Sequence, residues 1–114
     1  MDFKVLAGNL GLEEDEYMEL IELFVERSMS DLAKLEASIR DSNTDEAAIA
    51  AHSMKGAAGN LGIMDFYESA AKIEMEVREG RIEEFSGTIQ ALRNSLEVIA
   101  EFAGIDAFPR RQNL

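Results

Sequence analysis

Apolar residues recur every three or four positions through most of the chain, and this spacing constrains the fold more than any other feature. Near the C-terminus they form a seam of the kind that packs helices into bundles: Ile82, Phe85, Ile89, Leu92, Leu96, Ile99 and Ala103. Pro109 is the single proline, so none interrupts the preceding periodic segments. Because proline breaks helix interiors, its absence from these segments favours long helices. The sequence therefore predicts an all-α fold.

The periodicity predicts four long helices. They cover residues 14–40, 45–60, 65–78 and 82–102. Asn43 followed by Glu46 resembles a capping box at the start of the second helix. The glycines expected to end helices are Gly62, Gly80 and Gly104. Short connections place consecutive helices antiparallel, so we expect an up-down-up-down antiparallel four-helix bundle with a short N-terminal helical segment.

The length of 114 residues fits one domain. We divide it into an N-terminal cap segment at 1–12, the bundle at 13–104 and a flexible tail at 105–114. The acidic start lacks a long apolar run, so no signal peptide is expected. No apolar stretch reaches the length of a transmembrane helix. These features predict a cytoplasmic protein.

The charge of the chain excludes several classes of partner. Its net charge is −12, from 23 acidic and 11 basic residues. Nucleic acids and anionic lipids both attract basic surfaces, so we expect no nucleic-acid partner and no membrane partner. The chain has no cysteine, which excludes disulfides, thiolate metal sites and cysteine nucleophiles.

The single histidine of the chain, His52, lies in the second predicted helix, within AAHSMKGAAGNLG. On a helical wheel, the apolar stripe of this helix consists of Ala47, Ala50, Met54, Ala57, Ala58 and Leu61. His52 points away from this stripe, so we expect it to face solvent. The residues within roughly 60° of it on the wheel are Asp45, Ala48, Ile49, Lys55, Gly56 and Gly59.

The surroundings of His52 favour a reactive side chain over an ordinary surface histidine. Gly56 and Gly59 each cost about 1 kcal/mol of helix stability relative to alanine, and close approach by another backbone is the usual reason for such glycines. Helix packing is the alternative explanation, but it requires a second contact surface on this side. Lys55 lies one turn from His52; taken alone, it is an ordinary solubilising charge. Together these residues predict a nucleophile presented to a docking protein.

The motif H-x-x-K-G, followed by another glycine, resembles that of the histidine-containing phosphotransfer (HPt) domains. The matching residues are His52, Lys55, Gly56 and Gly62, with Ala70 and Glu74 of the next helix also similar to the family. The resemblance extends over residues 13–103. It implies that His52 accepts a phosphoryl group from an aspartyl phosphate and passes it to a second aspartate. The implied partners are receiver domains of hybrid histidine kinases and response regulators.

The resemblance implies that Nε2 of His52 is the nitrogen that reacts. From the positions around the histidine we expect Lys55 to offset the charge of the phosphoryl oxygens, and Gly56 and Gly59 to admit the loops of the partner. We expect Ala48 and Ile49 to belong to an apolar docking patch. We expect no metal site and no cofactor in the chain itself, and Mg²⁺ arrives with the receiver. The sequence contains no nucleotide-binding loop, so we expect no kinase activity of its own.

Three other interpretations remain to be weighed. A non-catalytic module would bind receivers without phosphate turnover, but the presence of both His52 and Lys55 favours the active form. A carboxylate-bridged metal bundle needs Glu-x-x-His pairs, whereas Ile49 stands three residues before His52 and no second histidine exists. A structural dimerisation bundle would use the glycine face as its seam. A phosphorelay domain need not self-associate, so we expect a monomer.

Overall fold

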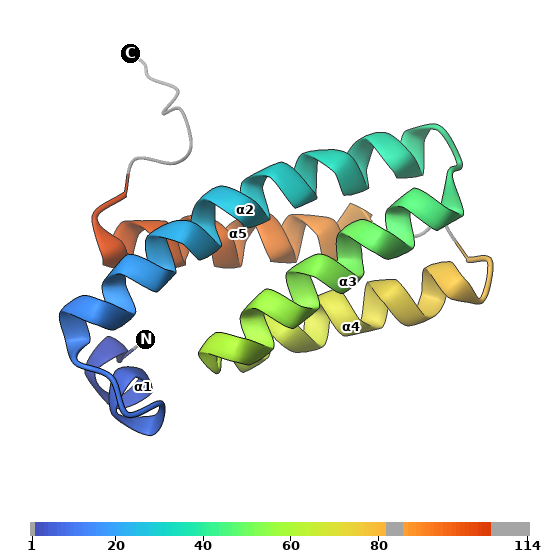
Figure 1. Cartoon of the computed structure of the whole chain (residues 1–114). Helices are drawn as coiled ribbons and strands as arrows, with labels where there is room; N and C mark the ends of the chain where they lie inside the picture. Colours follow the sequence, from blue (N-terminus) through green and yellow to red (C-terminus); the bar gives the residue numbers. More distant parts are fainter. Residues whose placement is uncertain (1, 82–85, 106–114) are drawn as a thin grey trace, which may run out of the picture.

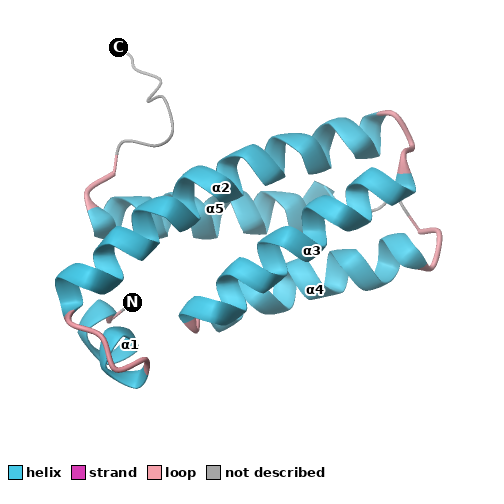
Figure 2. Cartoon of the chain, viewed as in Figure 1, coloured by secondary structure: helices cyan, strands magenta, loops and turns pink. Residues whose placement is uncertain are grey.

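The computed structural model describes residues 2–81 and 86–105. Five helices are described: α1 (Phe3–Asn9), α2 (Glu14–Arg40), α3 (Thr44–Leu61), α4 (Met64–Arg78) and α5 (Ser86–Ala103). They are connected by turns and loops, with no strand anywhere in these two ranges (Figures 1 and 2). The prediction of an all-α chain is confirmed.

The helix boundaries follow the sequence signals closely. The predicted helix over residues 14–40 coincides with α2, and the next two predictions differ from α3 and α4 by no more than one residue at either end. The expected start of the fourth helix, at Ile82, lies outside the described residues. The predicted tail lies outside them as well, apart from Ile105.

The two ends of α3 are fixed by local chemistry. Asn43 Oδ1 accepts a hydrogen bond from the backbone N–H of Glu46 at 3.1 Å, which satisfies one of the free donors at a helix start. The N–H of Asn43 donates to the carbonyl of Ser38 at 2.8 Å, so the predicted capping box forms in one direction only. Gly62 ends α3 in the left-handed conformation, with φ +76°, where glycine is favoured.

Helices α2 to α5 lie alongside one another and enclose a shared core (Figure 1). The helix α3 packs against α2 and α4, and α5 contacts the same two helices. The largest fully buried side chains of the core are Tyr17, Phe66, Ile21, Leu32, Leu35, Met54, Ile73, Leu92 and Leu96. The rings of Phe24 and Phe66 meet edge to face, with centroids 5.2 Å apart. This packing fixes the face that α3 turns to solvent.

The N-terminal helix α1 packs at one end of α2 (Figure 1). Phe3 and Ala7 are buried, and the Phe3 ring lies 6.0 Å from Tyr17 and 6.3 Å from Phe102 between centroids. Asp2 Oδ1 caps the helix by accepting from the backbone N–H groups of Lys4 and Val5. This short helix therefore adds side chains to the core.

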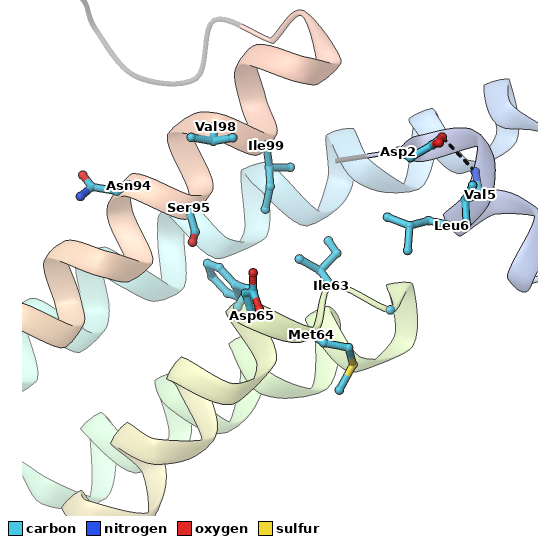
Figure 3. Close-up of a pocket in the computed structure, with 12 residues that line it drawn as sticks. Asp2, Val5, Leu6, Ile63, Met64, Asp65, Asn94, Ser95, Val98 and Ile99 are labelled. Atoms are coloured by element: carbon cyan, nitrogen blue, oxygen red, sulfur yellow. Dashed lines mark hydrogen bonds between the residues drawn. The ribbon is translucent and has the colours of Figure 1, made fainter.

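A cavity of about 690 Å³ opens at this end of the molecule, between α1, the turn from α3 to α4, and α5. Its apolar walls include Val5, Leu6, Ile63, Met64, Val98 and Ile99 (Figure 3). None of the residues predicted to form the functional site lines it. None of the described helices is long and apolar enough to cross a membrane.

Candidate functional site

The helix α3 presents His52 to solvent, as the wheel predicted. Its side chain is 63% exposed. The opposite stripe faces the core: Ala47, Ala50, Met54, Ala58 and Leu61 are buried, and Ala57 is half-buried. The imidazole therefore stands on the outer face of a helix whose inner face is fully used in packing.

The Glu74 carboxylate on α4 connects His52 to two cations. His52 Nδ1 lies 3.0 Å from Glu74 Oε2. Lys55 Nζ is 2.7 Å from the other oxygen, Oε1. Arg78, one turn along α4, donates to Oε2 from Nε at 3.1 Å and from Nη2 at 2.9 Å. One carboxylate thus joins three basic side chains from two helices.

The environment of Glu74 keeps its carboxylate ionised. Its side chain is only 9% exposed, and burial by itself would raise the pKa of the carboxyl. Hydrogen bonds from Lys55 and Arg78 and the positive charge of Lys55 act in the opposite direction. The hydrogen bond to His52 adds to them, and the net result is a pKa below the ordinary value of 4.5.

The ionised carboxylate determines which nitrogen of His52 carries the proton. An ionised carboxylate accepts hydrogen bonds and has none to donate, so Nδ1 of His52 must be the donor to Glu74 Oε2. In a neutral imidazole the second nitrogen is then an unprotonated acceptor. The outer nitrogen, Nε2, therefore carries the free lone pair and is the ring nitrogen that can accept a proton or form a new bond.

The group that orients His52 cannot be identified from the helical wheel of α3. Glu74 belongs to the core-facing side of α4, together with the buried residues Phe66, Ala70, Ile73 and Val77. A carboxylate among apolar residues at helical spacing requires buried partners. This pattern is the sequence feature that indicates a polar partner for Glu74. The partner itself lies 22 residues away, which helical spacing alone does not reveal.

The predicted docking residues separate into exposed and covered positions. Ile49 is 61% exposed. A Cβ placed on Gly56 would meet no atom within 4 Å. On Gly59 it would lie 3.2 Å from Cδ2 and 3.3 Å from Cε2 of Tyr67. The close approach at Gly59 therefore comes from α4 of the same chain, as the helix-packing alternative proposed.

The prediction that Ala48 lies on the docking surface is wrong. Ala48 is only 4% exposed and belongs to the core. It precedes Lys55 by seven residues and Gly59 by eleven, so all three lie along one edge of α3. Lys55 and Gly59 both contact α4. The helix α4 thus lies beside part of the edge that the wheel of an isolated α3 places near His52, although Gly59 itself remains exposed.

A second polar chain lies beside the site, on the α2 side of α3. Ser53 Oγ donates to Oδ2 of the buried Asp31 at 2.7 Å. Arg27 Nε donates to Ser53 Oγ at 3.4 Å. This chain was not predicted from the sequence. Within the described residues, no group of three or more histidine, cysteine or acidic side chains is placed to hold a metal ion.

Comparison with known proteins gives a consistent result. The model of the Hpt domain family matches residues 19–102. No curated protein matches the chain. The crystal structure of histidine-containing phosphotransfer protein B (HptB) from Pseudomonas aeruginosa PAO1 is similar, with a TM-score of 0.79 and 25% sequence identity. The similarity covers 91% of this chain and 90% of that protein.

Proposed function

The chain belongs to the Hpt domain family and is a histidine phosphotransfer protein of a phosphorelay, and from this premise we propose that His52 is its phosphoryl carrier. The contact between His52 Nδ1 and Glu74 Oε2, at 3.0 Å, carries the proposal. It leaves the lone pair on Nε2, the nitrogen that the 63% exposed side chain presents to solvent.

The reaction begins when Nε2 attacks the phosphorus of an aspartyl phosphate on a receiver domain. The N–P bond forms as the P–O bond to the aspartyl carboxylate breaks, and the carboxylate leaves with the bonding electron pair. The proton on Nδ1 stays in place, and Glu74 stabilises the positive charge that develops on the ring. Transfer to a second receiver reverses these bond changes. Phosphoryl transfer asks the protein mainly for positioning and charge neutralisation.

In this proposal Lys55 contacts both the Glu74 carboxylate and the phosphoryl group. Its ammonium group has three N–H donors, and one of them is directed to Glu74 Oε1 at 2.7 Å. The remaining donors can meet the phosphoryl oxygens next to His52. We propose that Lys55 offsets part of the phosphoryl charge while Glu74 holds it in place.

The docking surface combines Ile49 and Gly56 of α3 with Leu23 of α2. Ile49 and Leu23 are exposed large apolar side chains, and Gly56 leaves space above the helix. Arg27, one turn from Leu23, contacts α3 at Ser53, which supports placing this face of α2 beside the site. Such a small-residue, partly apolar face suits a receiver that brings its own cleft.

The proposed partners are the receiver domains of hybrid histidine kinases and response regulators. In this proposal the chain needs no cofactor of its own, and the receiver supplies Mg²⁺. We further infer that α2 to α5 form an up-down-up-down antiparallel bundle, supported by the short connections between α2 and α3 and between α3 and α4. The protein acts as a cytoplasmic monomer, without nucleic-acid or membrane partners, and Tyr67 already covers part of the glycine face that a dimer seam would use.

The test is phosphotransfer from a receiver domain carrying a labelled aspartyl phosphate. We expect acid-labile, base-stable label on the wild-type protein and none on His52→Gln, which keeps the helix and removes the nucleophile. Circular dichroism of the variant controls for folding. Label retained by folded His52→Gln would overturn the assignment.

A further inference from the structure

Ser53 and Lys55 flank His52 on opposite sides of α3. Around the helix, Ser53 lies about 100° from His52 in one direction and Lys55 about 60° in the other. Their contacts follow this division: Lys55 binds Glu74 on α4, while Ser53 binds Asp31 on α2. Any group attached to His52 Nε2 therefore projects between an α4 flank and an α2 flank.

On the α4 flank, Lys55 and Arg78 both bind Glu74, so one carboxylate offsets the charge of only one of these two cations. The α2 flank carries Arg27, which is exposed. No carboxylate of the described residues forms an ion pair with Arg27. Within the described residues, its guanidinium is therefore a cation beside the site without a direct ion pair, and the nearest carboxylate that it is linked to, Asp31, is connected only through the Ser53 hydroxyl.

The polar chain beneath Arg27 holds this guanidinium against α3. Asp31 is buried and accepts a hydrogen bond from the Ser53 hydroxyl. The Ser53 oxygen then has lone pairs available and accepts from Arg27 Nε. The two terminal amino groups of Arg27 make no hydrogen bond within the described part of the chain. They form the planar fork of donors that matches phosphate oxygens.

We propose that Arg27 is a second phosphate-binding residue, which contacts the phosphoryl group on His52 Nε2 from the α2 flank. The proposal rests on the proposed role of His52. A protein-bound phosphoryl group carries a charge of about −1.5 to −2 near neutral pH, and this chain already has a net charge of −12. Arg27 lowers the electrostatic cost of adding that charge, and Asp31 and Ser53 are positioning residues that act through it.

The titration of the phosphoryl group itself tests this proposal. The small donor phosphoramidate can load His52 without a receiver: the Nε2–P bond forms, the P–N bond of phosphoramidate breaks, and its nitrogen leaves as ammonia. The ³¹P chemical shift of the product is then followed against pH in the wild type and in Arg27→Gln. A nearby cation favours the dianion, so we expect the phosphoryl pKa to rise by about 0.5 to 1 unit in Arg27→Gln.

Three further variants separate phosphate binding from a structural role. Arg40→Gln removes the same charge about 20 Å further along α2, at a rise of about 1.5 Å per residue, and should leave the titration unchanged. In Arg27→Lys the phosphoryl pKa should rise less than in Arg27→Gln, because lysine keeps the charge but not the planar fork. Ser53→Ala should raise the phosphoryl pKa by less than Arg27→Gln does, since it releases the guanidinium without removing it.

Each outcome distinguishes the two proposals. Phosphohistidine that forms at position 52 and titrates identically in the wild type and Arg27→Gln would overturn the role of Arg27. Slower transfer to a receiver with an unchanged titration would also overturn it, because Arg27 would then act on the partner. Failure of the wild-type protein to form phosphohistidine at His52 would overturn both proposals.

Discussion

At the scale of single residues, the Glu74 carboxylate binds three basic side chains and is less exposed than any of them. Its side chain is 9% exposed, whereas those of His52 and Arg78 are 63% and 58% exposed. The basic groups can regain water if the carboxylate is removed, but the carboxylate itself depends on them. Substitution of Glu74 therefore affects both the orientation of His52 and the stability of the fold.

We expect Glu74→Gln to lower the free energy of unfolding at neutral pH by about 1 kcal/mol. Because the pKa of Glu74 is lower in the folded protein than its ordinary value of 4.5, its ionised form stabilises the fold. The stabilisation is fully present above about pH 4.5 and disappears as the pH falls through the lowered folded-state pKa. Denaturant titrations of both proteins across this range measure the difference, and a difference that persists at low pH would contradict this assignment.

His52 and Glu74 also mark the limit of sequence reasoning at this scale. The exposure of His52 follows from the pattern of its own helix, which is local information. Its hydrogen bond joins residues 22 positions apart on two helices, and it depends on how α3 and α4 are aligned. The pattern of a single helix contains no information about that alignment. The family resemblance therefore indicates Glu74 as a similar residue, but it does not identify Glu74 as the partner of Nδ1.

At the scale of elements, α3 is a helix with two differently used edges. On one edge Ala48 is buried and Gly59 lies next to Tyr67 of α4, while on the other edge Gly56 faces open space. The periodicity predicted the start and end of α3 within one residue because those depend on local signals. It did not predict which edge is covered, because that is decided by a neighbouring helix.

Because Gly56 faces open space, its substitution should change stability and phosphotransfer in opposite directions. We expect Gly56→Leu to raise the free energy of unfolding by about 0.5–1 kcal/mol, because glycine is unfavourable inside a helix and a Cβ here meets no atom. The same side chain should block the receiver and reduce phosphotransfer at least tenfold. Thermal unfolding and transfer assays measure the two effects.

Gly87 of α5 provides the matched control, since a Cβ there also meets no atom within 4 Å. Gly87 lines a shallow pocket between α4 and α5, together with Asp65, Lys72 and Ala91. Gly87→Leu should leave transfer at the wild-type rate. Equal losses of transfer in both variants would contradict a docking role specific to Gly56.

At the scale of the whole molecule, α1 lies outside the residues 19–102 that the family model matches, yet it completes one end of the core. Phe3 is 6% exposed and contacts the rings of Tyr17 and Phe102. We expect Phe3→Ala to lower the free energy of unfolding by about 3 kcal/mol, while transfer to His52 continues at temperatures where the variant is folded. Denaturant unfolding and phosphotransfer at low temperature measure the two effects.

Val5→Ala serves as the control for this substitution, because Val5 is on the same helix but exposed. Its unfolding free energy should change by less than about 0.5 kcal/mol. If Phe3→Ala behaved in the same way, α1 would not contribute to the stability of the core.

The hydrogen bond between His52 and Glu74 has a consequence for the whole phosphorelay cycle. In the proposed transfer, the neutral ring keeps its one proton on Nδ1 throughout, because Nε2 reacts through its lone pair. In this arrangement the phosphoryl group passes between two aspartates, and the histidine ring exchanges no proton with water on the way.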